Sequence, residues 1–359
     1  MNEIGIASGP FSFTGRAPIS LAKVTNYASS TPQTVSFSQW LGKTWKITKT
    51  YDLNFLTGYT FNLTSNATVP GRMFFRVNVP SGVYIYGTNA SVPAFTITGG
   101  ANIDPYWVDS MELNVEGNIY GKGGKGGTQS STVSIRNGEK GGTAVYVNSP
   151  SGVKVNIKLG GSSGSPAVIA GGGGGGAAMY GSANPASYVG GGGGGGAGGG
   201  IGGGPNPVTS PANLPGQLGQ PQGVNPNDRT QSGGMGGSQF PGAPSGSGFD
   251  VRAGAGGAGG QLSVAGGFNS PGGLASSQDN PGEDTTFSTF VPATSSRGGA
   301  SGGGWGARGG NATFISPGLT DISTGGEGGE AVLVVNPGTT ISPGSVGVIY
   351  GRVITPSRG

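Results

Sequence analysis

Residues 167–176 read AVIAGGGGGG, a short apolar segment that runs directly into six consecutive glycines. Two related segments carry similar residue types in the opposite order, GGTAVYV at residues 141–147 and GGEAVLV at residues 328–334. Each of these two continues into a turn that contains Asn, Pro and Gly. Self-similar units that combine a strand with a turn indicate a repeat architecture. We therefore expect strands that stack as β-helix-like rungs or as one small sheet.

A second pair of matching segments predicts that the two ends of this repeat lie side by side. GNIYGK at residues 117–122 corresponds to GVIYGR at residues 347–352. If the last strand returns to the first, residues 111–170 and 328–359 form one β-helix-like base. The chain between them, residues 171–327, is then an insertion that is held at its base.

The composition excludes most of the usual catalytic chemistry. The 359 residues include 81 glycines and 25 prolines but no histidine and no cysteine, and 9% of them are charged. The chain therefore has no imidazole base, no thiolate nucleophile, no Cys/His zinc site and no disulfide. The net charge of +4 is small for this length and by itself predicts no polyanionic partner. We expect no enzyme activity, no cofactor, no bound metal and no nucleic acid partner.

The sequence also lacks the usual signals for membranes and export. No window approaches 18 apolar residues, and the N-terminal MNEIGIASGPFSF has no basic segment followed by an apolar run. We expect no membrane insertion and no export by a signal peptide. The absence of cysteine fits synthesis in a cytosol, and it fits equally a particle that later leaves the cell.

Glycine is unevenly distributed along the chain. Residues 1–110 contain 10 glycines and three of the four tryptophans, whereas residues 161–310 contain 50 glycines. The first part consists of short β-branched or aromatic segments bounded by Gly, Pro, Asn or Ser, which is typical of strands. We expect residues 1–110 to form a β-rich domain, a small antiparallel sandwich or barrel with the aromatic residues in its core.

Seven glycine tracts alternate with segments of another composition, and four structures compete to explain them. A flexible linker does not require such alternation. Collagen needs glycine at every third residue over long runs. Phosphate-binding loops need a strand-to-helix unit, which the region lacks. The remaining structure is a bundle of polyglycine II helices, extended three-residue helices whose N–H and C=O groups pair with neighbouring helices. The tracts are Gly171–Gly176, Gly190–Gly204, Gly233–Gly237, Gly254–Gly260, Gly266–Gly273, Gly298–Gly310 and Gly325–Gly329.

In such a bundle the segments between the tracts become loops at its two ends. These segments carry nearly all the chemical variety of the region, and they comprise residues 177–189, 205–232, 238–252, 274–297 and 311–324. A rigid scaffold that presents variable loops is the usual geometry of a recognition surface. The predicted fold class is therefore all-β: an N-terminal β-sandwich or barrel, β-helix-like rungs, and a polyglycine II helix bundle with end loops over residues 171–327.

The alternation of glycine-rich motifs with loop segments resembles the receptor-binding adhesins at the tips of long tail fibres in T-even-like phages. In that family the motifs form a polyglycine II sandwich, and the segments between them contact the host receptor. The succession GNIYGKGGKGG, GGTAVYVNSPSGVKV and AVIAGGGGGG is similar to sequences of many tail-tip and tail-fibre proteins. The resemblance covers roughly residues 111–354, and the N-terminal ASGPFSF, APISLAKV and TVSFSQWLG are more loosely similar to phage tail proteins.

The resemblance implies a virion tail component, made in the host cytoplasm, that binds a host outer-membrane protein or a surface glycan. It also implies attachment to other phage tail or fibre proteins through the N-terminal domain. Receptor contacts would fall on the loop segments, and aromatic and Arg side chains supply most interface hot spots. The candidates are Tyr180, Tyr188, Phe240, Phe249, Trp305 and Arg308. For Trp305 and Phe249, packing against the glycine bundle as end caps is the alternative.

Other functions and sites stay open as alternatives. A tail-associated polysaccharide depolymerase, a purely structural virion protein and an ice-binding protein would each fit part of the pattern. The acidic cluster Asp279, Glu283 and Asp284 could in principle hydrolyse glycosides or bind a cation, but a solvated acidic run is the commoner case. Lys122, Lys125 and Lys140, together with Arg136, form the densest basic patch, which we interpret as a solvated loop face, with a site for lipopolysaccharide phosphate as the alternative.

Overall fold

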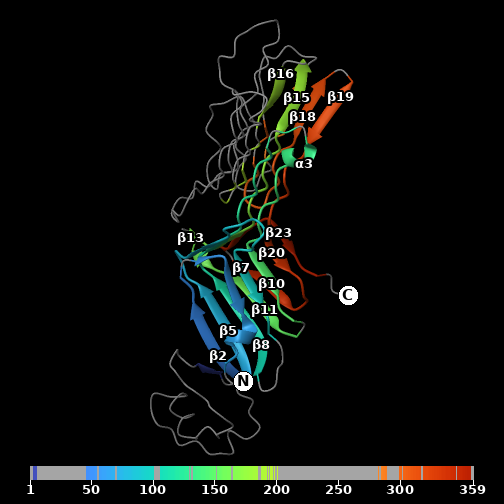
Figure 1. Cartoon of the computed structure of the whole chain (residues 1–359). Helices are drawn as coiled ribbons and strands as arrows, with labels where there is room; N and C mark the ends of the chain where they lie inside the picture. Colours follow the sequence, from blue (N-terminus) through green and yellow to red (C-terminus); the bar gives the residue numbers. More distant parts are fainter. Residues whose placement is uncertain are drawn as a thin grey trace, which may run out of the picture.

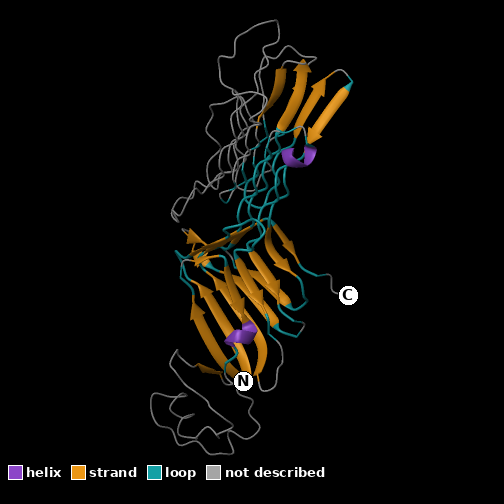
Figure 2. Cartoon of the chain, viewed as in Figure 1, coloured by secondary structure: helices purple, strands orange, loops and turns teal. Residues whose placement is uncertain are grey.

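The computed structural model describes residues 3–5, 46–100, 106–200, 282, 284–288 and 299–356, with gaps of one or two residues inside the longer ranges. Figure 2 shows that strands and extended loops make up nearly all of this part of the chain, with two helices of one turn each, α2 (Leu63–Asn66) and α3 (Val133–Arg136). The predicted all-β fold class is confirmed.

The larger body is a coil of parallel strands in which each rung contributes one strand to each of three faces. All neighbours within a face pair in parallel, and Figure 1 shows the strands lying side by side below the glycine-rich part. Face A consists of β1 (Glu3–Gly5), β2 (Lys46–Asp52), β5 (Gly71–Val79), β8 (Tyr106–Val115), β11 (Lys154–Leu159) and β21 (Thr339–Pro343). Face B consists of β3 (Leu56–Thr57), β6 (Tyr84–Tyr86), β9 (Asn118–Tyr120), β14 (Val168–Ala170) and β22 (Val348–Tyr350). Face C consists of β4 (Tyr59–Asn62), β7 (Phe95–Thr98), β10 (Val145–Asn148), β20 (Glu330–Val334) and β23 (Arg352–Ile354).

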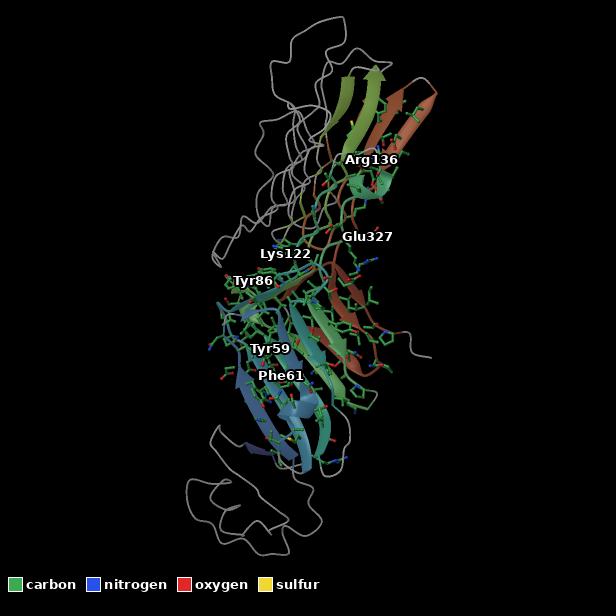
Figure 3. All side chains as sticks on the ribbon, in the orientation of Figure 1. Tyr59, Phe61, Tyr86, Lys122, Arg136 and Glu327 are labelled. Atoms are coloured by element: carbon green, nitrogen blue, oxygen red, sulfur yellow. The ribbon has the colours of Figure 1, made fainter. Side chains whose placement is uncertain are left out.

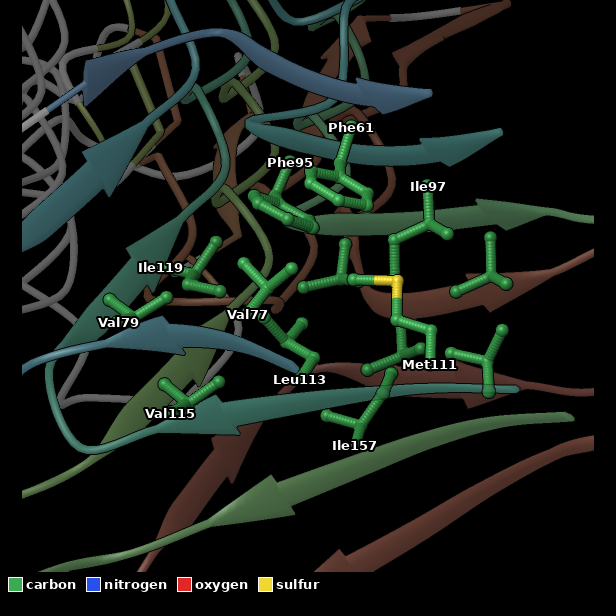
Figure 4. Packing of buried hydrophobic residues seen from close by; sticks show 14 of the residues in the cluster. Phe61, Val77, Val79, Phe95, Ile97, Met111, Leu113, Val115, Ile119 and Ile157 are labelled. Atoms are coloured by element: carbon green, nitrogen blue, oxygen red, sulfur yellow. The ribbon is translucent and has the colours of Figure 1, made fainter. Parts of the chain in front are cut away.

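The core of this β-helix is built from columns of apolar side chains that repeat from rung to rung. Because side chains alternate along a strand, every second residue points inward, as the alternating burial of β7 and β11 shows. Parallel in-register pairing then places like residues above one another. Figure 4 shows part of the resulting core. The fully buried columns are Val77, Leu113 and Ile157 on face A, Ile85, Ile119 and Ile169 on face B, and Phe61, Ile97 and Val147 on face C.

The antiparallel sandwich expected for residues 1–110 is wrong for the part of it that the structure describes. Strands β2 to β7 pair in parallel and form the first two rungs of the same β-helix as residues 111–170. The expected boundary at residue 110 falls inside β8. Short strands separated by turn residues occur both in antiparallel sandwiches and in parallel β-helices. Local sequence therefore does not show whether the next strand pairs as a hairpin or whether the chain first passes through the two other faces of a β-helix.

From β2 onward, the two longest connections leave the β-helix at one corner, between a face B strand and the face C strand that follows it. The connection at this corner is a single residue in the first and fifth rungs, Gly58 and Gly351. It comprises residues 87–94 in the second rung, 121–144 in the third and 171–329 in the fourth. The glycine-rich part of the chain therefore projects from one corner, as Figure 2 shows.

Short strands lie at the far end of this projection, and α3 lies just below them on the side of the β-helix (Figure 1). Strands β15 (Met179–Asn184) and β16 (Ser187–Gly191) form an antiparallel hairpin. Strand β18 (Ala312–Ser316) pairs in parallel with β17 (Thr285–Ser288) and in antiparallel with β19 (Leu319–Ser323). A two-stranded hairpin of β12 (Gly161–Ser162) and β13 (Ser165–Pro166) lies on the β-helix. No helix in the described ranges is long and apolar enough to span a membrane.

Candidate functional site

The glycine tracts are joined by backbone hydrogen bonds that repeat every third residue. The N–H groups of Gly121, Gly124 and Gly127 donate to the carbonyls of Ala170, Gly173 and Gly176, each at 2.8 Å. A β-strand would repeat such bonds every second residue and an α-helix bonds within itself, so neither accounts for this spacing. The two tracts run in the same direction, because donor and acceptor numbers rise together.

The tract at residues 171–178 lies among several neighbours. The N–H groups of Gly172 and Gly175 donate to the carbonyls of Gly142 and Glu139, both at 2.9 Å, so the tract at residues 136–142 runs in the opposite direction. Residues 303–306 and 326–329 also donate to carbonyls of the 171–178 tract. Because successive residues of one tract point to different neighbours, the hydrogen bonds link the tracts into an array and not into a single sheet.

Glycine is required where the tracts approach each other most closely. A Cβ atom built on Gly124 would overlap the carbonyl oxygen of Glu139, and one built on Gly175 would overlap the carbonyl oxygen of Lys125. Both neighbours are backbone atoms, which cannot rotate away as a flexible side chain could. The array thus replaces side-chain packing with contact between backbones, which explains the low apolar content of the region.

Trp305 packs where the array joins the outer surface of face B. Its side chain is fully buried and stacks on Tyr120, with ring centroids 4.8 Å apart and planes 27° apart. Buried Val168 and Ala170 and half-buried Tyr84, Tyr86, Val348 and Tyr350 complete this cluster. Two interpretations of Trp305 were open, packing and receptor contact. Its complete burial agrees with packing. Trp305 is therefore removed from the receptor-contact candidates.

Glu330 lies at the same junction, where the last glycine tract re-enters the β-helix. Its carboxylate, 4% exposed, accepts hydrogen bonds from Lys140 Nζ at 2.6 Å, Thr143 Oγ1 at 3.0 Å and Arg352 Nη2 at 3.2 Å. Burial by itself would raise the pKa of Glu330, but the hydrogen bonds, led by that from Lys140, bring the pKa below its ordinary value. The carboxylate connects the ends of both long insertions with the last rung.

A second ion pair lies toward the far end of the array. Arg136 of α3, 1% exposed, makes a bidentate contact with Asp321 of β19, with Nη1–Oδ2 at 2.6 Å and Nη2–Oδ1 at 2.9 Å. Figure 3 shows Arg136 beside the distal strands, well above the labelled core residues Tyr59 and Phe61. The expected basic patch is therefore divided. Arg136 and Lys140 are ion-paired, whereas Lys125 is exposed and the half-buried Lys122 has a pKa lowered by burial.

The remaining predicted contact residues have different positions. Tyr180 and Tyr188 belong to the β15–β16 hairpin. Phe240 and Phe249 lie outside the described residues. Arg308 is exposed, and its Nη1 lies 3.7 Å from Asp284 Oδ1.

The acidic cluster can be followed only in part. The Asp284 carboxylate accepts the Asn311 N–H at 2.7 Å, which indicates a structural role for this acid. Asp279 and Glu283 lie outside the described residues. Within the described ranges no group of three metal-ligating side chains occurs.

Sequence reasoning missed four exposed aliphatic side chains on α3 and β19. Val133 and Ile135 of α3 are 47% and 51% exposed, and Leu319 and Ile322 of β19 are each 54% exposed. Large aliphatic side chains with such exposure are most informative where several occur on neighbouring elements. Here the Arg136–Asp321 pair holds α3 against β19. Both segments are too short for a periodic sequence signal.

Comparison with known proteins gives three results. No curated protein matches the chain. A solved structure, the gp37–gp38 adhesin tip complex of the bacteriophage S16 long tail fibre, aligns over 93% of this chain and 91% of that chain, with 18% identity and a TM-score of 0.43. The model of the family described as phage tail fibre adhesin Gp38 matches residues 43–248, more than half of the chain. The predicted adhesin resemblance is thereby confirmed: the chain belongs to the phage tail fibre adhesin Gp38 family and is a tail adhesin that binds a host receptor.

Proposed function

We propose that the β-helix attaches the chain to a tail fibre protein and that the far end of the glycine array binds the receptor. The observation that carries this proposal is that the insertions at residues 121–144 and 171–329 leave the β-helix at one corner and carry a separate group of short elements, α3 and β15 to β19. An adhesin needs one end on the virion and another that reaches the host surface. Synthesis in the host cytoplasm and incorporation into the virion tail complete the proposal.

We further propose that the glycine tracts are polyglycine II helices. Two observations support this assignment, the three-residue spacing of the hydrogen bonds and the backbone overlap that any Cβ atom would cause at Gly124 and Gly175. Such a helix rises about 3.1 Å per residue, so a tract of six residues spans about 19 Å. An array of these helices would hold the distal elements away from the β-helix on a stiff support.

For the receptor surface we propose two groups of residues. The first keeps the aromatic and Arg candidates Tyr180, Tyr188, Phe240, Phe249 and Arg308. The second adds the exposed aliphatic side chains Val133, Ile135, Leu319 and Ile322. Binding is favoured when aliphatic side chains are buried against another apolar surface, and a saccharide offers little apolar surface. This favours an outer-membrane protein over a surface glycan as the receptor.

The test is phage adsorption with matched Asp substitutions. Val133 of α3 and Val92 of the second-rung connection are both 47% exposed, so V133D and V92D introduce the same change at equal exposure. We expect V133D to slow adsorption at least about tenfold, because central contacts carry most of the binding energy of an interface. V92D should adsorb like the parent phage. The reverse result would assign receptor binding to the β-helix.

For the mechanism, we propose that the protein binds its receptor non-covalently and catalyses no reaction. The support for this proposal is the adhesin family together with the absence of histidine and cysteine from the sequence. Release of reducing sugar from host capsule or lipopolysaccharide by the purified protein would contradict it and favour the depolymerase alternative.

A further inference from the structure

The glycine array has a register problem that its own hydrogen bonds do not solve. Hydrogen bonds between tracts recur every third residue, and most positions in the tracts are identical. A shift of one tract by three residues therefore presents the same donors, acceptors and close backbone contacts. Glycine-rich strands specify their register weakly for the same reason. Something outside the glycine backbone must select one register.

The parallel segments 136–144 and 321–330 show where this selection can occur. Their backbones pair at three points, where the N–H groups of Gly138, Gly141 and Ala144 donate to the carbonyls of Thr324, Glu327 and Glu330 at 2.9 Å each. Near the β-helix the register is fixed, because β10 and β20 pair through the buried residues Val145 and Val332. Between that end and α3, the sequences GEKGGT and TGGEGG are nearly repetitive triplets.

We infer that the buried Arg136–Asp321 pair fixes the register of the array at its distal end, which makes these two residues positioning residues. The guanidinium is 1% exposed and both of its terminal nitrogens bond the Asp321 carboxylate. A three-residue slip would move the two groups apart by about 9 Å, given a rise of about 3.1 Å per residue. Arg136 would then be buried without its carboxylate, and an uncompensated buried charge is strongly unfavourable.

Glu330 does not make the same selection. If residues 321–330 shifted so that Glu327 took the position of Glu330, Lys140 would still find a carboxylate. The Arg136–Asp321 pair has no such substitute in that shift, because residue 318, which would then lie beside Arg136, is glycine. The two ion pairs at the ends of this segment thus have different roles.

The register also decides where the exposed side chains of α3 lie relative to β19. Arg136 directly follows Ile135, so a slip would move Val133 and Ile135 by the same distance relative to β19. Under the proposed function, which this consequence assumes, the receptor would meet a displaced surface. The register itself can be tested without any receptor.

Disulfide trapping measures the register directly, since the chain contains no cysteine that could interfere. Asn137 Oδ1 accepts the Thr324 N–H at 2.9 Å, so the pair N137C/T324C reports the native register. A three-residue bulge within residues 138–143 would bring residue 137 opposite Glu327, with Thr324 in place of Asp321 beside Arg136, so N137C/E327C reports a slip in that direction. The opposite slip, in which Glu327 takes the position of Glu330, would bring residue 140 opposite Thr324, so K140C/T324C reports it. Each reporter pair is introduced into four backgrounds: the parent protein, R136M/D321L, R136D/D321R and the control R76M/E112L. In the control, an ion pair of face A with Nε–Oε1 at 3.2 Å is replaced in the same way.

We expect the parent and R76M/E112L to form the 137/324 disulfide and almost none of the 137/327 or 140/324 disulfide. In R136M/D321L the ratio of slipped to native disulfide should rise at least about tenfold while the protein stays folded, because apolar replacement of a buried ion pair commonly preserves stability. The reversed pair R136D/D321R should restore the parent ratio. If R136M/D321L is insoluble, the single variant D321N makes the same comparison. A folded R136M/D321L or D321N variant that cross-links only at 137/324 overturns the inference. If adsorption were lost while the register stayed unchanged, the proposed function would be supported at these residues and the register inference would be overturned.

Discussion

Gly175→Ala tests whether backbone contact holds the array together. Gly175 is buried, its N–H donates to the Glu139 carbonyl at 2.9 Å, and its own carbonyl accepts the Gly326 N–H at 2.7 Å. The added Cβ would overlap the carbonyl oxygen of Lys125 and lie 2.8 Å from the Gly126 nitrogen. To relieve this overlap the tract must move away from residues 125–126, which disrupts both hydrogen bonds of Gly175.

The magnitude follows from these contacts. A buried donor or acceptor that loses its partner costs about 1–3 kcal/mol, so two of them cost about 2–6 kcal/mol. Alanine reduces the entropy of the unfolded chain, which offsets about 0.4–1 kcal/mol. We therefore expect G175A to lower the free energy of unfolding by about 1–5.6 kcal/mol.

The assay is denaturant unfolding followed by circular dichroism, with hydrogen exchange of peptides from residues 171–178 to locate the loss. Gly160→Ala is the matched control, because its Cβ would meet Glu116 Cγ at 3.5 Å and Val115 O at 3.7 Å, which are ordinary contacts. G160A should change the free energy of unfolding by less than about 1 kcal/mol. If G175A were as stable as G160A, with unchanged exchange in the array, the argument from close backbone contact would be refuted.

Two further predictions concern the junction between the array and the β-helix. Trp305→Ala removes a fully buried ring and its stack on Tyr120, so it should destabilise the protein by about 3–5 kcal/mol in denaturant unfolding; an unchanged stability would contradict the burial. The pKa of Glu330 lies below its ordinary value of 4.5 in the folded protein, so its contribution to stability is present above that value and is lost as the pH falls through the folded pKa. Glu330→Gln should accordingly reduce the loss of stability on acidification below about pH 5, measured as melting temperature against pH; a profile identical to that of the parent protein would show that the carboxylate is not held in this way.

Local sequence patterns were enough to predict several elements of the fold. The repeats at residues 141–147, 167–176 and 328–334 predicted strands that stack as β-helix-like rungs or as one small sheet. In the structure β10 and β20 are neighbours on face C, whereas β14 lies on face B of the same β-helix. Alternation of apolar and polar residues identified short strands, because that periodicity is a property of each strand by itself. The direction in which residues 46–98 pair was predicted incorrectly, because direction depends on how the chain returns and not on the residues of the strand.

The candidate site was less predictable. Trp305 was noted as an aromatic residue that interrupts a glycine tract, with receptor contact and packing both left open. Its burial against Tyr120 depends on a contact between segments far apart in the chain. The exposed Val133 and Ile135 gave no signal, because a helix of four residues is too short to show periodicity. The pairing of Arg136 with Asp321 joins residues separated by 185 positions, and nothing near either residue identifies the other.

The sequence by itself determined that this protein is built from short stacked strands and from glycine tracts. Both features can be recognised from residues that are close together in the chain. Only the tertiary structure decided which glycine tracts are neighbours, in which direction they run, and which charged residues meet at their ends. The physical reason is that glycine has no side chain by which one tract could recognise another. The choice of partner therefore depends on the β-helix at the base and on ion pairs such as Arg136–Asp321, which exist only once the chain has folded.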